Sequence, residues 1–201
     1  MPCLADIAKK LNDRIWFTRI ARIYSEKRLL RNGLHSQLLL MFYAVYSIAL
    51  SVTQLKFKPI PDDAATVFGI ILSVILFGLT FHMSSRGFAA RAQRFKENYT
   101  HLQLLSGRLD VAECQAESTE LQKVIEYVQA EYSTAIANCE NHTTMDDRCA
   151  RFPYGKKGTS RILTNWDYTC VLFYSIGRYL SLGLLYASPV VIYGYMLCAM
   201  K

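Results

Sequence analysis

The residues that could support catalysis are few in this 201-residue chain, and they are scattered. Its four histidines, His35, His82, His101 and His142, are isolated from one another in sequence. No nucleophile-elbow, zinc-protease, phosphate-binding-loop or dinucleotide-binding pattern accompanies them. The sequence therefore predicts a protein that is not an enzyme, with no catalytic residues, no cofactor and no metal-ligand set.

One compact polar cluster, Glu140-Asn141-His142, follows a predicted helix. One interpretation is a helix end whose polar side chains form local hydrogen bonds. The other is a site that receives a small anionic ligand or contacts a sensor domain. The sequence leaves both interpretations open.

Further polar residues lie inside long apolar segments, several of them at helical spacing. They are Ser47, Ser51 and Gln54 in the first segment, and Ser73, Thr80, His82 and Ser84 in the second. One interpretation is packing between helices, as small residues provide in membranes. The other is that a polar stripe lines a water-filled path formed by several subunits, with His82 as a pore or gate residue, because ionisable groups inside a membrane are costly.

These residues must be positioned by two membrane-spanning helices. Residues 36–55 carry no charge, and residues 64–85 carry only the titratable His82. About 20 helical residues cross a hydrocarbon core. Pro59 and Pro61 lie in the short connection and stop the first helix. Residues 35–86 are therefore expected to form a tight transmembrane hairpin.

A third apolar block occupies residues 179–200, within a predicted C-terminal helix of residues 166–201. It is long enough to span, with Arg178 at its start and a kink expected at Pro189. The alternative is that it lies on or re-enters the membrane.

The net charge of +7 is distributed unevenly along the chain. Basic residues crowd the region before His35 and the region just after residue 85, whereas the hairpin turn carries few. Positively charged flanks stay in the cytoplasm, so both ends of the hairpin are expected inside the cell. Topology and anionic lipid account for the charge, and no direct nucleic-acid binding is expected.

The polar regions are expected to be helical as well. Residues 1–34 are predicted to form an amphipathic N-terminal helix that ends or bends near Asn32-Gly33. This helix either lies on the inner leaflet or packs on the cytoplasmic helical bundle, and we favour the bundle. Residues 87–140 continue from the second span and form an antiparallel pair, because apolar residues recur in steps of four and three, as in a coiled coil. Residues 141–165 are expected to be a loop, with a flexible turn at residues 155–158.

Two strings give the chain a resemblance to a known family. They are RIWFTRIARIYSEKRLLRNGLHSQLLLMFYAVYSIALS at residues 14–51 and CENHT at residues 139–143. Together with the hairpin and the third apolar block, they resemble the SLATT family, the two-transmembrane effector domains associated with bacterial nucleotide-synthase and SLOG conflict systems. The resemblance covers nearly the whole chain.

The resemblance implies a membrane effector that opens pores or disrupts the membrane when a partner senses phage infection. The implied partners are a nucleotide-signal synthase, a SLOG sensor or a reverse transcriptase. The matching strings supply the candidate regulatory residues Arg31, Asn32, His35, Gln37, Glu140, Asn141 and His142.

We therefore expect an all-α protein of the bacterial inner membrane, with one SLATT-like effector domain over residues 1–201. The leading hypothesis is a homo-oligomeric pore that contacts membrane lipid and acts in abortive infection. The alternative is a non-conducting, membrane-anchored scaffold that recruits a partner enzyme through its cytoplasmic helices. An enzyme acting on lipid or nucleotide is a third hypothesis, which the missing site motifs disfavour.

Overall fold

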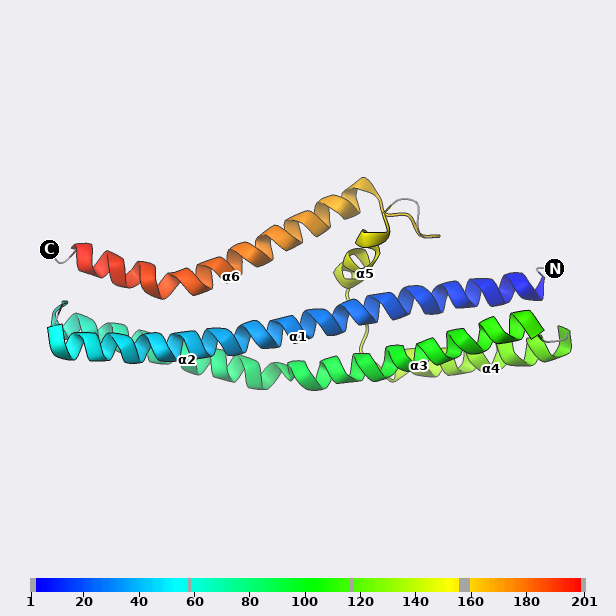
Figure 1. The fold of residues 1–201 in the computed structure, drawn as a ribbon, viewed down its shortest axis with the longest axis horizontal. Coiled ribbons are helices and arrows are strands. Elements are labelled where there is room, and N and C mark those ends of the chain that lie inside the picture. The colour runs from blue at the N-terminus through cyan, green and yellow to red at the C-terminus, as the bar shows by residue number, and fades with distance from the viewer. Residues whose placement is uncertain (1–2, 58, 116–117, 156–159, 200–201) are drawn as a thin grey trace. The chain divides into compact units, whose positions relative to one another are not determined.

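The computed structural model describes residues 3–57, 59–115, 118–155 and 160–199, and these residues form helices and short connections without a strand. The helices are α1 (Leu4–Phe57), α2 (Asp62–Arg86), α3 (Phe88–Gln115), α4 (Ser118–Ala137), α5 (Thr144–Arg151), the 3-10 helix η1 (Phe152–Tyr154) and α6 (Asn165–Ala199) (Figure 1). The predicted all-α fold class is confirmed.

The chain divides into two compact units. Residues 1–30 and 89–172 form the first, here called the bundle unit, and residues 31–88 and 173–201 form the second, here called the membrane unit. Helix α1 contributes its first half to the bundle unit and its second half to the membrane unit. Each unit is described by itself below.

Three helical stretches are long and apolar enough to cross a membrane. They begin at Leu4, Asp62 and Asn165. Their most apolar 18-residue windows have mean hydropathies of 1.8, 2.3 and 1.5. The chain is therefore a membrane protein, and by length and composition the C-terminal block joins the hairpin as a candidate third span.

The membrane unit is held together by aromatic and leucine side chains. Leu39 and Tyr43 of α1 pack with Phe68 and Leu72 of α2, and all four are buried. The turn between the two helices is closed by Gln54, whose Nε2 donates to the Ile60 carbonyl oxygen at 2.7 Å. Because this donor satisfies a backbone acceptor beside the prolines, the turn can be short without leaving that carbonyl unpaired.

Helix α6 joins this unit through the backbone around its proline. Pro189 has no N–H, so it cannot donate to the carbonyl of Leu185, four residues earlier. The Tyr43 hydroxyl of α1 supplies that donor instead, 2.9 Å from the Leu185 oxygen, and lies 2.8 Å from the Ser188 hydroxyl. Tyr46 donates to the Pro189 carbonyl at 3.0 Å. Figure 1 shows α6 changing direction in its second half.

The bundle unit buries one apolar core among three helices. The core residues are Ala8, Leu11 and Ile15 of α1, Leu102, Leu105 and Leu109 of α3, and Ile125, Val128 and Ala135 of α4. The steps of four and three in α4 therefore mark a buried face, as predicted. The N-terminal helix packs against the α3–α4 pair, which was the favoured of its two predicted positions.

The sequence placed several helix boundaries incorrectly. Helix α1 does not end at Asn32-Gly33 but continues to Phe57. An added Cβ at Gly33 would lie 3.4 Å from the Phe88 Cβ, so Gly33 marks a close helix contact. Conversely, the helix expected to run unbroken beyond residue 86 ends at Gly87, whose φ of 53° is left-handed.

The predicted loop of residues 141–165 contains a helix. Residues Thr144–Arg151 form α5 and residues Phe152–Tyr154 form η1. A helix of eight residues is too short for apolar positions to recur over several turns, so its capping residues are its main signal. Of the predicted flexible turn at residues 155–158, only Gly155 lies within the described residues.

Replacement of Tyr43 by phenylalanine removes both of its hydrogen bonds to α6. We expect the variant to be less stable by about 1 kcal/mol, because the Leu185 carbonyl keeps only the Ser188 hydroxyl as a side-chain donor, at 3.2 Å, and the contact between α1 and α6 loses its hydrogen bonds from Tyr43. Thermal unfolding of the detergent-solubilised protein, followed by circular dichroism, measures the effect. Tyr195→Phe, at an exposed tyrosine of α6, is the matched control, and equal melting temperatures for the two variants would contradict the assignment.

Candidate functional site

The most developed polar site in the bundle unit begins with the cap of α5. Thr143 is the N-cap residue, and its hydroxyl accepts from the Asp146 N–H at 3.1 Å. Asp146 in turn accepts from the Thr143 N–H through Oδ2, also at 3.1 Å. This reciprocal capping box fixes the Asp146 carboxylate at the first turn of α5, where a negative charge complements the helix dipole.

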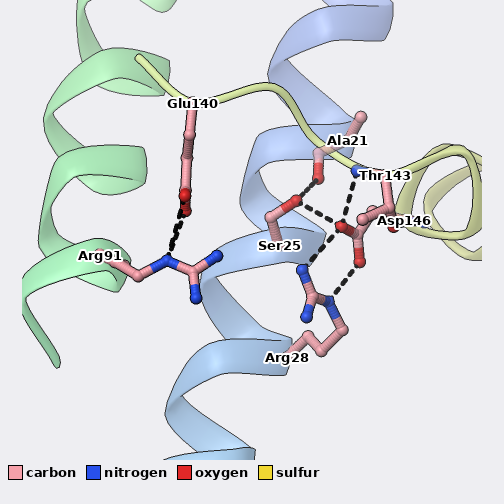
Figure 2. A network of polar contacts seen from close by, with 7 residues as sticks. All are labelled: Ala21, Ser25, Arg28, Arg91, Glu140, Thr143 and Asp146. Carbon is pink, nitrogen blue, oxygen red and sulfur yellow. Dashed lines mark hydrogen bonds and ion pairs between the residues drawn. The ribbon is translucent and has the colours of Figure 1, made fainter. Parts of the chain in front are cut away.

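Helix α1 supplies the partners of that carboxylate, as Figure 2 shows. The Arg28 Nε lies 2.6 Å from Asp146 Oδ1, and its Nη2 lies 3.0 Å from Oδ2. The Ser25 hydroxyl lies 3.0 Å from both Oδ2 and the Ala21 carbonyl oxygen. Asp146 itself is 0 % exposed, so this group, here called the α1–α5 latch, is a buried ion pair with satisfied oxygens.

The electrostatics of the latch favour an ionised Asp146. Burial raises the pKa of this carboxyl group, but the Arg28 hydrogen bond and charge and the Thr143 hydrogen bonds lower it by more, so the pKa lies below its usual value. The carboxylate is charged at neutral pH. The latch therefore holds α5 on α1 by a charge pair in which geometry and hydrogen bonding offset the cost of burial.

Arg22, six residues before Arg28 on α1, is buried without a carboxylate partner among the described residues. Its side chain is 1 % exposed and donates to the Asn98 side chain and, at 3.3 Å, to the Ala135 carbonyl oxygen. Among the residues that the structure describes, it forms no salt bridge. Burial lowers the pKa of Arg22, although the residue stays charged because its usual pKa is far above neutral.

The predicted Glu140-Asn141-His142 cluster lies beside these residues in the sequence but uses other partners. Glu140 pairs with Arg91 of α3, whose Nε lies 3.0 Å from both carboxylate oxygens, in a half-exposed position. Burial lowers the pKa of His142, so its ring is neutral at pH 7. Asn141 is exposed. The Glu140 contact is therefore with another helix rather than a local hydrogen bond at a helix end, and no interaction drawn in Figure 2 joins the Arg91–Glu140 pair to the latch.

The polar residues of the first span converge on one cavity of the membrane unit. Ser47, Ser51 and Gln54 of α1 line a cavity of about 520 Å³ together with Asp62 and Thr66 of α2. The Ser51 hydroxyl donates to the Ser47 carbonyl oxygen at 2.9 Å, which satisfies it within the helix. The cavity therefore has polar side chains in its lining and lies at the end of the hairpin that contains the turn.

The candidate polar residues of the second span do not line this cavity. Ser73, Thr80 and Ser84 are exposed on α2, away from the buried Phe68 and Leu72. The hydroxyls of Ser73 and Thr80 donate to carbonyl oxygens four residues earlier, at 2.9 and 2.8 Å. Because these residues are exposed in the described part of the chain, their surface is available to lipid or to another copy.

The candidate regulatory residues fall into both units. Asn32 and His35 line a second cavity of the membrane unit, of about 430 Å³, in which His82 also takes part. Arg31 and Gln37 are exposed on α1. The strings that resemble a known family therefore supply residues to both units.

Sequence reasoning missed the members of the latch. They are Ser25, Arg28, Thr143 and Asp146, with the buried Arg22 beside them. Two signals were present in the sequence. Thr-x-x-Asp at residues 143–146 is a capping pattern, and polar residues at positions 22, 25 and 28 recur every three residues on a helix whose other positions pack a core.

These features define the class of protein. Three apolar helices and a helical bundle with a buried polar latch make an all-α membrane protein, and the described residues contain no group of three or more potential metal ligands. The chain belongs to the SMODS and SLOG-associating 2TM effector domain family 5, whose family model matches residues 5–195. No curated protein and no solved structure gives a significant match.

Family membership confirms the resemblance seen in the sequence. It makes the chain an effector-domain protein linked to SMODS and SLOG partner proteins. The family name counts two transmembrane helices, and the described residues of this chain contain three helical stretches that are long and apolar enough to cross a membrane.

Replacement of Asp146 by asparagine tests the latch. Because the variant removes the buried carboxylate that pairs with Arg28 across α1 and α5, we expect a loss of about 3 kcal/mol at neutral pH. Thermal unfolding of the solubilised chain measures it. Glu140→Gln is the control, because it breaks a half-exposed ion pair and is expected to cost about 1 kcal/mol or less.

The latch also predicts a pH dependence. The folded-state pKa of Asp146 lies below its usual value of 3.8, so its stabilisation is present above that value and declines as the pH falls through the folded-state pKa. Asp146→Asn cannot lose a charge it lacks. The difference in melting temperature between the wild type and this variant should therefore shrink from pH 7 to pH 3, and a difference that stays constant would refute an ionised latch.

Proposed function

We propose that the chain is the membrane effector of a bacterial anti-phage system. It resides in the inner membrane, assembles as a homo-oligomer and opens a pore when a partner sensor or a nucleotide signal activates it. Membership of an effector-domain family associated with SMODS and SLOG proteins supports the general role. The three apolar helices support action at the membrane.

The observation that carries the pore proposal is the cavity lined by Ser47, Ser51 and Gln54. A polar wall between apolar helices is costly in lipid unless it packs against polar groups or borders water. One chain has too few spans to enclose a water path, so the proposal requires several copies. The exposed Ser73 and Thr80, with open space at Gly69, offer α2 as a small-residue surface at which another copy can approach closely.

The charge distribution supports one orientation. Basic residues are dense before His35 and again from Arg86 to Lys96, whereas the turn between α1 and α2 carries Lys56 and Lys58 beside two aspartates. The rule that positive flanks stay inside puts the bundle unit in the cytoplasm. There it is accessible to a soluble partner or signal.

Replacement of Ser51 by leucine tests conduction. In bacteria that carry the gene with its neighbouring genes, phage infection should depolarise the inner membrane when the wild-type chain is present. Ser51→Leu fills a cavity wall with an apolar group and is expected to abolish the depolarisation. A potential-sensitive dye measures the response, and membrane fractionation with immunoblotting confirms insertion.

Thr53→Leu is the matched control. Thr53 is also exposed on α1, and its hydroxyl likewise donates to the carbonyl oxygen four residues earlier, at 2.8 Å, but it does not line the cavity. This variant should conduct normally. Equal loss in both variants would mean that the cavity has no special role, and an unchanged potential in infected wild-type cells would exclude the pore.

A second candidate function is supported by a groove in the bundle unit. Its volume is about 1050 Å³, and it lies between α3 and α4, where Leu104, Val111 and Tyr127 are exposed. Exposed apolar side chains that border a groove are typical of a protein-binding surface. A non-conducting scaffold that recruits a partner enzyme would use such a surface.

The two functions respond differently to a charge in the groove. Ile125 and Val128 are buried, so a charge there would disrupt the core rather than test a surface. Leu104 is 63 % exposed, and Leu104→Asp should leave folding unchanged. The scaffold predicts loss of phage protection with this variant, and the matched control is Ile162→Asp, at a residue outside the groove that is 62 % exposed. Normal protection by both variants would exclude the groove as the recruiting surface.

A further inference from the structure

The membrane unit contains a second cavity, which the pore proposal does not use. Its volume is about 430 Å³. His35 of α1, His82 of α2 and Arg178 of α6 all line it. A neighbouring cavity of about 400 Å³ shares Arg178 and Asn32 with it, so the arginine borders two hollows.

Helical spacing explains why these residues meet. His35 and Leu39 are one turn apart on α1, and Leu39 is buried in the hairpin core. Leu79 and His82 are similarly related on α2, and Arg178 and Leu182 on α6. Each helix thus presents a basic residue and at least one leucine to the cavity. His35 begins the first span and His82 lies near the end of the second, so the cavity is at the end of the hairpin opposite its turn.

The described residues that line this cavity include basic and neutral polar groups but no carboxylate. In the part of the chain that the structure describes, Arg178 forms no salt bridge, and the buried Nδ1 of His35 has no hydrogen-bond partner. No aspartate or glutamate is among the described residues that line either cavity. Ser36 and Asn32 add a hydroxyl and an amide. An arginine that faces a cavity without a counter-charge is poised to accept an anion from outside the chain.

We propose that this cavity binds a phosphate group, supplied by an anionic lipid headgroup or by a soluble phosphorylated molecule. A guanidinium forms paired hydrogen bonds with phosphate oxygens, and a histidine ring offers an N–H donor in either protonation state. The proposal does not depend on conduction, and it holds equally for a pore and for a scaffold.

The apolar lining of the cavity favours the lipid as the source. Leu39, Leu79, Leu182 and Leu185 line it together with the polar groups. A ligand with a phosphate and an adjoining hydrocarbon chain would contact both kinds of lining residue. By the charge rule, this end of the hairpin faces the cytoplasm, where anionic headgroups concentrate next to basic residues.

The test uses the full chain purified in a non-ionic detergent. Thermal unfolding is measured with added dioleoylphosphatidylglycerol, with zwitterionic dioleoylphosphatidylcholine, with inorganic phosphate and with adenosine diphosphate. A ligand that binds the folded state raises the melting temperature with concentration. Phosphatidylglycerol should raise it, and phosphatidylcholine should do so much less.

Arg178→Gln removes the central donor and should weaken phosphatidylglycerol binding by about tenfold. Arg86→Gln is the matched control, because Arg86 is an exposed arginine near the same end of α2 that does not line the cavity. It should change binding by less than about twofold, as expected for a surface charge. Equal weakening by both variants would mean general attraction to charge and would overturn the site.

The remaining outcomes are also decisive. Stabilisation by phosphate or adenosine diphosphate that Arg178→Gln removes would support the site with a soluble ligand as its source. No stabilisation by any of the anions would overturn it. Helix content and gel filtration show whether Arg178→Gln folds. If it does not, His35→Gln takes its place, because it removes the histidine ring from the cavity and keeps a polar side chain. His35→Gln should also weaken phosphatidylglycerol binding.

Discussion

The membrane unit depends on one constraint, which is that hydrocarbon offers no hydrogen bonds to the backbone. A helix satisfies this constraint because its backbone groups bond to one another, and a proline inside a helix is an exception. Pro189 leaves the Leu185 carbonyl without its helical donor, and Tyr43 supplies one from α1. The same hydrogen bond that satisfies the backbone attaches the third apolar helix to the hairpin, so a local defect in α6 becomes a contact between helices.

The bundle unit handles polar groups in a different way. It buries the Asp146 carboxylate completely but surrounds it with Arg28, Ser25 and the Thr143 N–H, so each carboxylate oxygen has partners. Asp146 also caps α5, a helix of eight residues that would be marginal alone. The latch therefore gives this short helix both its first hydrogen bonds and its attachment to α1.

The sequence predicted the parts of the fold that depend on long repeating patterns. Uncharged runs identified the three apolar helices, and steps of four and three identified the buried face that contains Ile125 and Val128. Prediction from the sequence failed where a single residue, or a contact with a residue distant in the sequence, determines the structure. Gly33 reads as a helix end, yet α1 continues through it, and the missing side chain lets Phe88 pack closely there. The partnership of Arg28 with Asp146 joins residues distant in sequence, which no local pattern encodes.

The contrast between paired and unpaired polar groups separates structural residues from candidates for function. Arg28 has its counter-charge within the chain, so its contribution is to hold the bundle together. Arg178 and His35 border a cavity, and in the described residues Arg178 has no counter-charge and the His35 Nδ1 no hydrogen-bond partner. A chain that only needed to fold would gain by replacing such donors with apolar residues, because an unsatisfied polar group near hydrocarbon is costly. Their presence beside four leucines is most simply explained by a ligand that brings the missing charge.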